Sequence, residues 1–117
     1  HSTDLPIIAQ TANVEQALFS MTSGRLGMTV IVNGDKQVVG VFTDGDLRRA
    51  LAKNITLSTT IDSVMTENPK TIAQDVRASD ALTIMNEKKV NQLLVLDDKK
   101  QLVGIISLHD LLQAGVK

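Results

Sequence analysis

The sequence lacks cysteine, tryptophan and tyrosine, and its only aromatic residues are Phe19 and Phe42. Without cysteine, the chain has no disulfide framework, no thiolate zinc site and no cysteine nucleophile. With so few aromatic rings, nucleic-acid bases have almost nothing to stack on, and lysine and arginine are spread along the chain rather than clustered. We therefore expect no nucleic-acid partner.

Long hydrophobic runs are also missing. The longest apolar stretches, such as residues 28–32 and 93–96, are far shorter than the roughly 20 residues that cross a bilayer. The chain does not open with the charged and apolar regions of a signal peptide. Its 117 residues are 43% hydrophobic and carry a formal charge of -1, which fits an ordinary globular protein. We expect a cytoplasmic protein with no membrane partner.

What the chain does contain is an internal duplication. Shifting the sequence by 64 positions, without any gap, brings identical residues together along most of its length. The matched pairs include Ala17 and Ala81, Leu18 and Leu82, Met21 and Met85, and Asp46 and Asp110. A gapless duplication of this kind predicts two copies of one supersecondary unit.

Hydrophobic spacing predicts the order strand, helix, strand, strand, helix in the first copy. An extended entry at 5–8 precedes apolar residues at i, i+3, i+4 and i+7 from Val14, which predict a helix with Met21 on its core face. Residues 28–32 and 37–42 are typical of a hairpin, whose Asn33-Gly34 turn tolerates positive φ. Thr43 begins the closing helix.

The second copy repeats this order. It has an extended entry at 71–72, a helix over about 78–85, strands at 92–96 and 101–107, and a closing helix through Leu111. Asp97 to Lys100 replaces the glycine turn. We predict repeat 1 at residues 1–53, a linker at 54–68 and repeat 2 at 69–117. In the linker, Ile61, Val64 and Met65 predict a short helical turn.

The predicted fold class is α+β, with two β-α-β-β-α repeats. A unit of about 50 residues buries too little apolar surface to be stable alone. The two sheets are therefore expected to pack against each other around a pseudo-twofold axis. That arrangement would create two equivalent clefts, one beside each copy of the motif described next.

Each copy carries the pattern glycine, two apolar residues, a hydroxyl, two variable residues and aspartate. The motif residues are Gly40, Thr43 and Asp46 in the first copy and Gly104, Ser107 and Asp110 in the second. One interpretation is a helix capping box, which stabilises each helix by about 1 kcal/mol. The other is a phosphorylated ligand, with phosphate on the hydroxyl and helix N–H groups, ribose on the carboxylate, and glycine allowing close approach. The spacing leaves both open.

The duplicated motif, with Ser63 to Pro69 leading into the second copy, resembles a pair of CBS domains, the tandem module named after cystathionine β-synthase. In that family the hydroxyl and aspartate contact the phosphate and ribose of adenine nucleotides. The resemblance carries these roles to Thr43 and Asp46 in one cleft and to Ser107 and Asp110 in the other. It implies AMP or ATP as an effector and no required cofactor.

A narrower resemblance concerns the host protein. Residues 27–30, 40–49 and 109–116 are similar to the C-terminal half of bacterial arabinose-5-phosphate isomerases, which act in the synthesis of the Kdo sugar of lipopolysaccharide. The resemblance implies that this chain follows an N-terminal sugar isomerase domain and regulates it, with CMP-Kdo as a further candidate effector and no catalysis of its own. A homodimer through the CBS pairs is also implied. The alternative is a structural dimerisation module with empty clefts, whose melting temperature ignores nucleotides.

Other polar residues carry weaker signals. His109 precedes Asp110, but adjacent helical residues point about 100° apart, so they do not form an acid-base pair. The two histidines lie at opposite ends of the chain and show no metal-ligand spacing. Arg48 and Arg49 lie near the first motif, where arginine suits phosphate or simply an exposed helix face. Leu112 and Gln113 replace them in the second copy, so the two clefts are chemically unequal.

Overall fold

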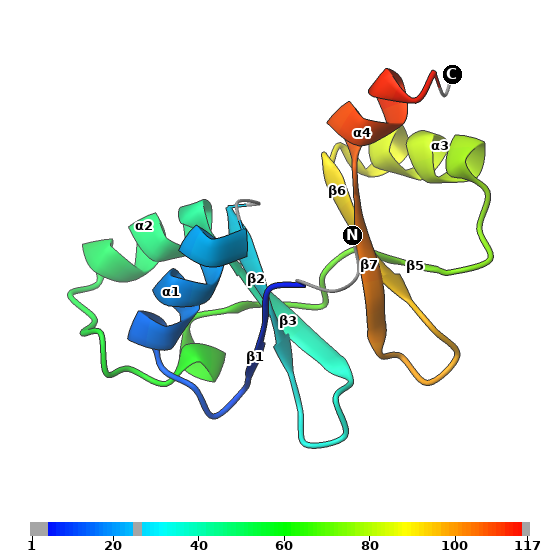
Figure 1. Ribbon diagram of the computed structural model, residues 1–117. Coiled ribbons are helices and arrows are strands. Elements are labelled where there is room, and N and C mark those ends of the chain that lie inside the picture. The colour runs from blue at the N-terminus through cyan, green and yellow to red at the C-terminus, as the bar shows by residue number, and fades with distance from the viewer. Residues whose placement is uncertain (1–4, 25–26, 116–117) are drawn as a thin grey trace. The chain divides into compact units, whose positions relative to one another are not determined.

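The computed structural model describes residues 5–24 and 27–115, which divide into two compact units (Figure 1). The first unit extends to Pro69 and the second begins at Lys70. Both contain the predicted order of strand, helix, strand, strand, helix. In each unit the two helices cover one face of the sheet (Figure 1). None of the described helices has the length and apolar content that crossing a membrane requires.

The first unit contains a four-stranded mixed sheet in the order β1-β2-β3-β4. Its elements are β1 (Ile7–Ala9), α1 (Val14–Gly24), β2 (Met28–Val32), β3 (Val38–Thr43), α2 (Asp44–Ala52), a 3-10 turn η1 (Ile61–Ser63) and β4 (Thr66–Glu67). Strand β1 is parallel to β2, whereas β3 is antiparallel to both β2 and β4. The short helical turn in the predicted linker is therefore confirmed, and β4 is an additional strand.

The second unit repeats this arrangement with three strands, in the order β5-β6-β7. Its elements are β5 (Thr71–Ala73), α3 (Ala78–Lys88), β6 (Gln92–Leu96), β7 (Leu102–Ser107) and α4 (Leu108–Gln113). The duplication extends to the strand register, because Met28 pairs with Thr43 in the first hairpin and Gln92 pairs with Ser107 in the second. Each hairpin also shifts register at the equivalent place near the end of its first strand.

Each unit has its own apolar core. The first core contains Val14, Ala17, Met21, Ile31, Phe42 and Ile61. The second contains Ile72, Ala81, Leu82, Met85, Leu93 and Leu111. The equivalent methionines, Met21 and Met85, are both buried as predicted. Burying such side chains supplies the main favourable free energy of folding in each repeat.

The segment predicted as a linker, residues 54–68, contributes to the first core. Ile61 is fully buried there, and its N–H donates to the Ala12 carbonyl at 2.8 Å. The backbone N–H groups of Val14 and Glu15, which open α1, donate to carbonyls of the same segment at 2.9 and 3.0 Å. The first N–H groups of a helix have no partner within the helix, so the segment satisfies donors that α1 leaves free.

The two hairpin turns share one side-chain mechanism. Asn33 Oδ1 accepts from the backbone N–H of Asp35 and Gln37 at 2.9 and 3.0 Å. At the equivalent position, Asp97 Oδ1 accepts from the second and fourth residues after it at the same distances. The predicted positive φ falls on Lys36 and Lys100 rather than on Gly34. The Asx side chain, not the glycine, therefore determines the turn.

Gly40 and Gly104 occupy equivalent positions in different surroundings. A Cβ atom on Gly40 would lie 2.6 Å from Met65 Sδ and 2.8 Å from the Thr66 carbonyl oxygen, because β4 runs against β3 there. A Cβ atom on Gly104 would meet no atom of the described residues within 4 Å. The first glycine is required by the close approach of a backbone strand, whereas the second leaves open space in its own unit.

These surroundings predict that a glycine-to-alanine substitution costs more stability at Gly40 than at Gly104. Gly40→Ala should lower the free energy of unfolding by about 1–3 kcal/mol, because the added methyl forces β4 away from β3. Gly104→Ala is the matched control and should change it by less than about 0.5 kcal/mol. Urea unfolding followed by far-ultraviolet circular dichroism measures both. Equal stability of the two variants would contradict the close packing at Gly40.

Candidate functional site

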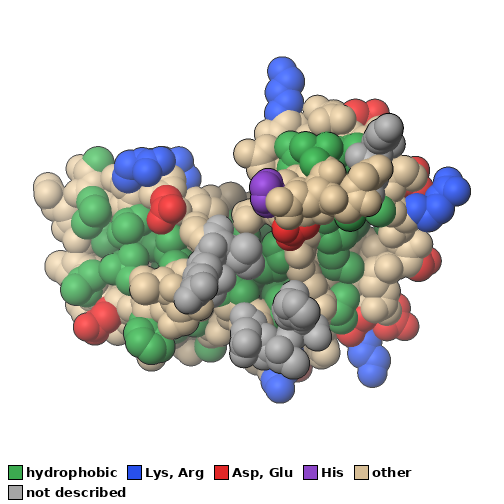
Figure 2. Space-filling view, turned by 45° about the horizontal axis from the view of Figure 1, so that its top comes forward, with side chains coloured by type: hydrophobic (Ala, Val, Ile, Leu, Met, Phe, Trp, Pro, Cys, Tyr) green, Lys and Arg blue, Asp and Glu red, His purple; other side chains and the backbone are tan. Residues whose placement is uncertain are grey.

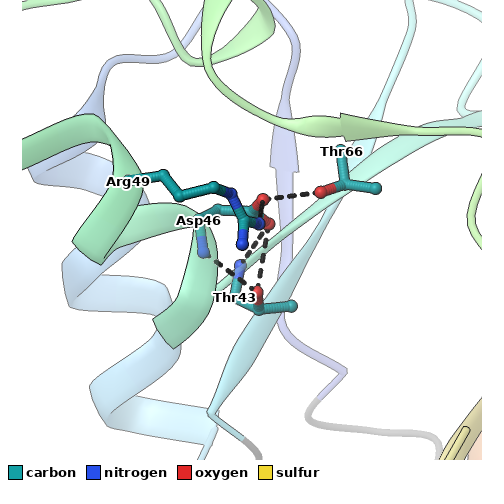
Figure 3. A network of polar contacts seen from close by, with 4 residues as sticks. All are labelled: Thr43, Asp46, Arg49 and Thr66. Atoms are coloured by element: carbon teal, nitrogen blue, oxygen red, sulfur yellow. Dashed lines mark hydrogen bonds and ion pairs between the residues drawn. The ribbon is translucent and has the colours of Figure 1, made fainter. Parts of the chain in front are cut away.

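The first motif forms a closed polar network at the start of α2 (Figure 3). The Thr43 backbone N–H donates to Asp46 Oδ2 at 2.9 Å, and the Asp46 N–H donates to Thr43 Oγ1 at 3.3 Å. This reciprocal pair is the capping box that the spacing predicts. Thr66 Oγ1 donates to Asp46 Oδ1 at 2.5 Å, and Arg49 forms an ion pair with the same oxygen.

These partners leave the Asp46 carboxylate little freedom to bind anything else. Asp46 is only 3% exposed, although it carries a charge. Burial by itself would raise the pKa of Asp46, but hydrogen bonds from Thr66, Arg49 and Thr43 outweigh it and lower the pKa below its ordinary value of 3.8. The charged carboxylate is therefore the form that the folded first repeat stabilises.

The second motif is only half closed. Ser107 Oγ accepts from the Asp110 N–H at 3.1 Å, so the serine caps α4 as predicted. The Asp110 carboxylate is exposed and makes no hydrogen bond or ion pair with any residue in the described part of the chain. One difference in sequence contributes to this, since Gln113 stands where the first repeat has Arg49. The position equivalent to Thr66 is Ser2, which lies outside the described residues.

A hollow of about 590 Å³ lies beside the second motif. Its lining residues are Asn91, Gln92, Ser107, Leu108, His109 and Leu112. The side chains combine amide, hydroxyl and imidazole groups with two leucines, a mixture typical of small-molecule sites. Asn91 and Gln92 were not among the predicted site residues. The only sequence signal for them is that these two polar residues stand at the start of β6, where the first repeat has Gly27 and Met28.

The predicted site residues make more contacts in the first motif than in the second. Thr43 and Asp46 contact each other, and Thr66 joins them from β4, whereas Gly40 lies against β4 itself. Ser107 and Asp110 also meet at their helix start. Sequence spacing did not predict that Thr66 bonds Asp46, because the two residues lie 20 positions apart. Among the described residues, no cluster of three or more histidine or acidic side chains could hold a metal ion.

The sequence matches the family model of the CBS domain over residues 1–53 and 61–117. The chain belongs to the CBS-domain family. The predicted α+β tandem pair is thereby confirmed, and the two matched segments correspond to the two copies of the duplication. The sheet-to-sheet packing of the CBS repeats stays a prediction.

Curated relatives of this CBS pair include sugar-phosphate isomerases. Arabinose 5-phosphate isomerase KdsD of Pseudomonas aeruginosa is 43% identical over 113 residues, which are 96% of this chain and 35% of that protein. Arabinose 5-phosphate isomerase GutQ of Escherichia coli K12 is 38% identical over 112 residues, with the same coverage of each chain. The chain thus spans about a third of the length of these relatives. The narrower resemblance noted in the sequence is confirmed as similarity to their CBS portion.

Solved structures show the same fold. The CBS domain protein PAE2072 of Pyrobaculum aerophilum, determined in complex with AMP, superimposes with a TM-score of 0.78 at 23% identity, covering 89% of this chain and 80% of that one. At this identity the likeness establishes the fold.

The Asp46 network predicts a pH-dependent contribution to stability. Asp46→Asn should lower the free energy of unfolding at pH 7 by about 1.5–3 kcal/mol, because it removes hydrogen bonds to a charged group. The folded pKa lies below 3.8, so the contribution of the carboxylate is present above that pH and is lost as the pH falls through the folded pKa. Chemical denaturation of both proteins between neutral and acid pH measures this.

Asp110→Asn is the matched control, since it makes the same change at the equivalent exposed position. It should alter the free energy of unfolding at pH 7 by less than about 0.5 kcal/mol. If Asp46→Asn were as stable as wild type at pH 7, the network would not stabilise the first repeat. If the difference in unfolding free energy between the two proteins persisted unchanged in acid, the stabilisation would not come from the carboxylate charge.

Proposed function

We propose that this chain is the ligand-sensing regulatory module of a bacterial arabinose-5-phosphate isomerase, acting on a catalytic domain that lies N-terminal to it. The proposal is supported by the similarity to KdsD and GutQ, of which the chain matches about a third. No enzymatic role is proposed for the CBS pair itself. Among the described residues, no group of histidine and acidic side chains could hold a catalytic metal ion. The polar groups of the two motifs are suited to binding a ligand.

The ligand we propose is an adenine nucleotide or the sugar nucleotide CMP-Kdo, bound at the second motif. The observation that carries this is the Asp110 carboxylate, which is exposed and bonded by no described side chain, on the helix start whose Ser107, Leu108 and His109 line the hollow. A carboxylate accepts hydrogen bonds from both hydroxyls of a ribose. The Ser107 hydroxyl is placed to meet phosphate, and Leu108 and Leu112 offer apolar surface to a base. The AMP-bound structure of PAE2072 supports the ligand class.

The first motif is not expected to bind in the same way. A ribose at Asp46 would have to displace Thr66 and Arg49 from a carboxylate that is almost fully buried. The net free energy of ligand binding would be small, because each hydrogen bond that Asp46 makes to the ligand is offset by one that it loses to Thr66 or Arg49. We therefore assign Thr43, Asp46 and Gly40 to the structure of the first repeat, and Ser107 and Asp110 to the ligand.

Regulation requires that the ligand prefer one of two states. A nucleotide that binds one arrangement of the CBS pair more tightly shifts the population toward it, and the attached catalytic domain responds by the same coupling free energy. Without such a preference, binding would leave the isomerase unchanged. The proposal therefore includes a difference in nucleotide affinity between the active and inactive isomerase.

A second candidate function is dimerisation of the parent enzyme. It is favoured by exposed apolar side chains on the helices of the first repeat, Phe19 on α1 at 76% and Leu51 on α2 at 56% exposure. Apolar side chains of this size on adjoining helices are typical of association surfaces. This role is compatible with ligand sensing, because a nucleotide that stabilises one dimer arrangement would affect dimerisation and regulation together.

The ligand assignment predicts the effect of one substitution on binding. Calorimetric titration with AMP, ATP and CMP-Kdo should detect binding of at least one, and Asp110→Asn should weaken it by about tenfold or more. Asp98→Asn is the matched control, because Asp98 is an exposed acid in the β6–β7 turn, away from the hollow. It should leave the affinity unchanged.

The experiment contradicts the proposal in two ways. The chain would have no ligand of this class if none of the three compounds binds. The site would lie elsewhere if Asp110→Asn and Asp98→Asn have the same effect on affinity.

A further inference from the structure

A second hollow, of about 420 Å³, lies within the first repeat, between α2 and the segment from Ile55 to Thr66. This volume is within the range of small-molecule sites. Its polar lining comes from both sides and consists of Asp46 and Arg49 on α2, Lys53 at the C-cap of α2, and Thr59, Ser63 and Thr66 on the segment.

The hollow carries a surplus of positive charge. Arg49 in the last turn of α2 and Lys53 at its C-cap both line the hollow. Lys53 is exposed, and its side chain makes no hydrogen bond or ion pair with the described residues. Arg49 uses one nitrogen on Asp46 and is 67% exposed, which leaves most of its five N–H donors available. Figure 2 shows basic side chains gathered on the first repeat over α2.

The acid in this hollow does not cancel both cations. Asp46 is its single lining carboxylate, and its oxygens are occupied by Thr43, Thr66 and Arg49. Cations in the last turn of a helix also interact favourably with the helix dipole. The dipole accounts for a basic residue at this place but not for a hollow lined on its other side by three hydroxyls.

The hydroxyls have hydrogen-bonding capacity to spare. Ser63 Oγ donates to the Thr60 carbonyl at 2.8 Å, and Thr66 Oγ1 donates to Asp46, so both oxygens keep lone pairs that accept. Thr59 Oγ1 accepts from the Thr56 N–H at 3.2 Å. One side of the hollow thus offers cationic donors and the other offers hydroxyl oxygens. A ligand that satisfies both sides carries a phosphate and several hydroxyl groups.

From this geometry we propose that the first repeat binds a monosaccharide phosphate in the hollow between α2 and residues 55–66. The phosphate lies against Arg49 and Lys53, where the planar guanidinium donates two parallel hydrogen bonds. The sugar hydroxyls donate to Ser63 and Thr59. This site is separate from the nucleotide site at Asp110 and stands on different residues.

The test is calorimetric titration of the chain with ribose 5-phosphate, with ribose and inorganic phosphate as probes of the two halves. Ribose 5-phosphate should bind more tightly than either half alone. Lys53→Ala should weaken its binding by about tenfold, the effect typical of losing a charged hydrogen bond. Lys53 is chosen because its loss leaves the Asp46 network in place. Arg48→Ala, which removes the same charge from a neighbouring position outside the hollow, should leave binding unchanged.

Two further results decide the matter. Asp110→Asn should retain ribose 5-phosphate binding, which separates this site from the nucleotide site and lets either fail alone. The proposal is overturned if ribose 5-phosphate does not bind, if it binds no better than phosphate, or if Arg48→Ala and Lys53→Ala weaken it equally. The last result would mean that the basic surface attracts anions without a defined site.

Discussion

The hydrogen bond from Thr66 to Asp46 is the contact on which the first repeat depends. It joins the start of α2 to β4, two elements that are separated by the whole segment after the helix. The same segment buries Ile61 in the core and accepts the first N–H donors of α1. A buried carboxylate is costly unless it is fully bonded, so Asp46 fixes the position of every group that bonds it.

This one contact makes two copies of a motif behave differently. Thr43 and Ser107 both cap their helices, so this half of the motif's local structure is the same in each repeat. What differs is the number of donors that reach the carboxylate. Asp46 receives four, from the Thr43 backbone and the side chains of Thr43, Arg49 and Thr66, whereas Asp110 receives none from the described residues. The duplication therefore preserved the cap, and the proposed ligand uses the carboxylate that no described residue bonds.

Much of the fold could be predicted because the duplication gives each element twice. A helix with Met21 on its core face is supported by the same spacing around Met85, and the two hairpins support each other. The turn mechanism was not predicted, because the sequence pointed to Gly34, whereas the equivalent residues Asn33 and Asp97 share the role. The two helix caps followed from spacing alone, because a cap is a contact between residues three apart.

The remaining features depend on contacts that have no sequence period. Nothing in the spacing pairs Thr66 with Asp46, and the two-residue strand β4 is too short for an alternating pattern. Gly40 resembled a glycine that admits a ligand, but the space beside it is filled by Met65 and the Thr66 backbone. The difference between the motifs was visible only as Arg49 against Gln113, which does not by itself show which carboxylate is covered.

The most direct measurement of this account is the number of nucleotides bound per chain. The protein has no tryptophan or tyrosine, so absorbance near 260 nm reports bound nucleotide with little interference in equilibrium dialysis. Using the nucleotide that binds most tightly, the account predicts saturation at one per chain, with the affinity weakened by about tenfold or more in Asp110→Asn. Saturation at two per chain, or an affinity that is unchanged in Asp110→Asn but lost in Asp46→Asn, would contradict it.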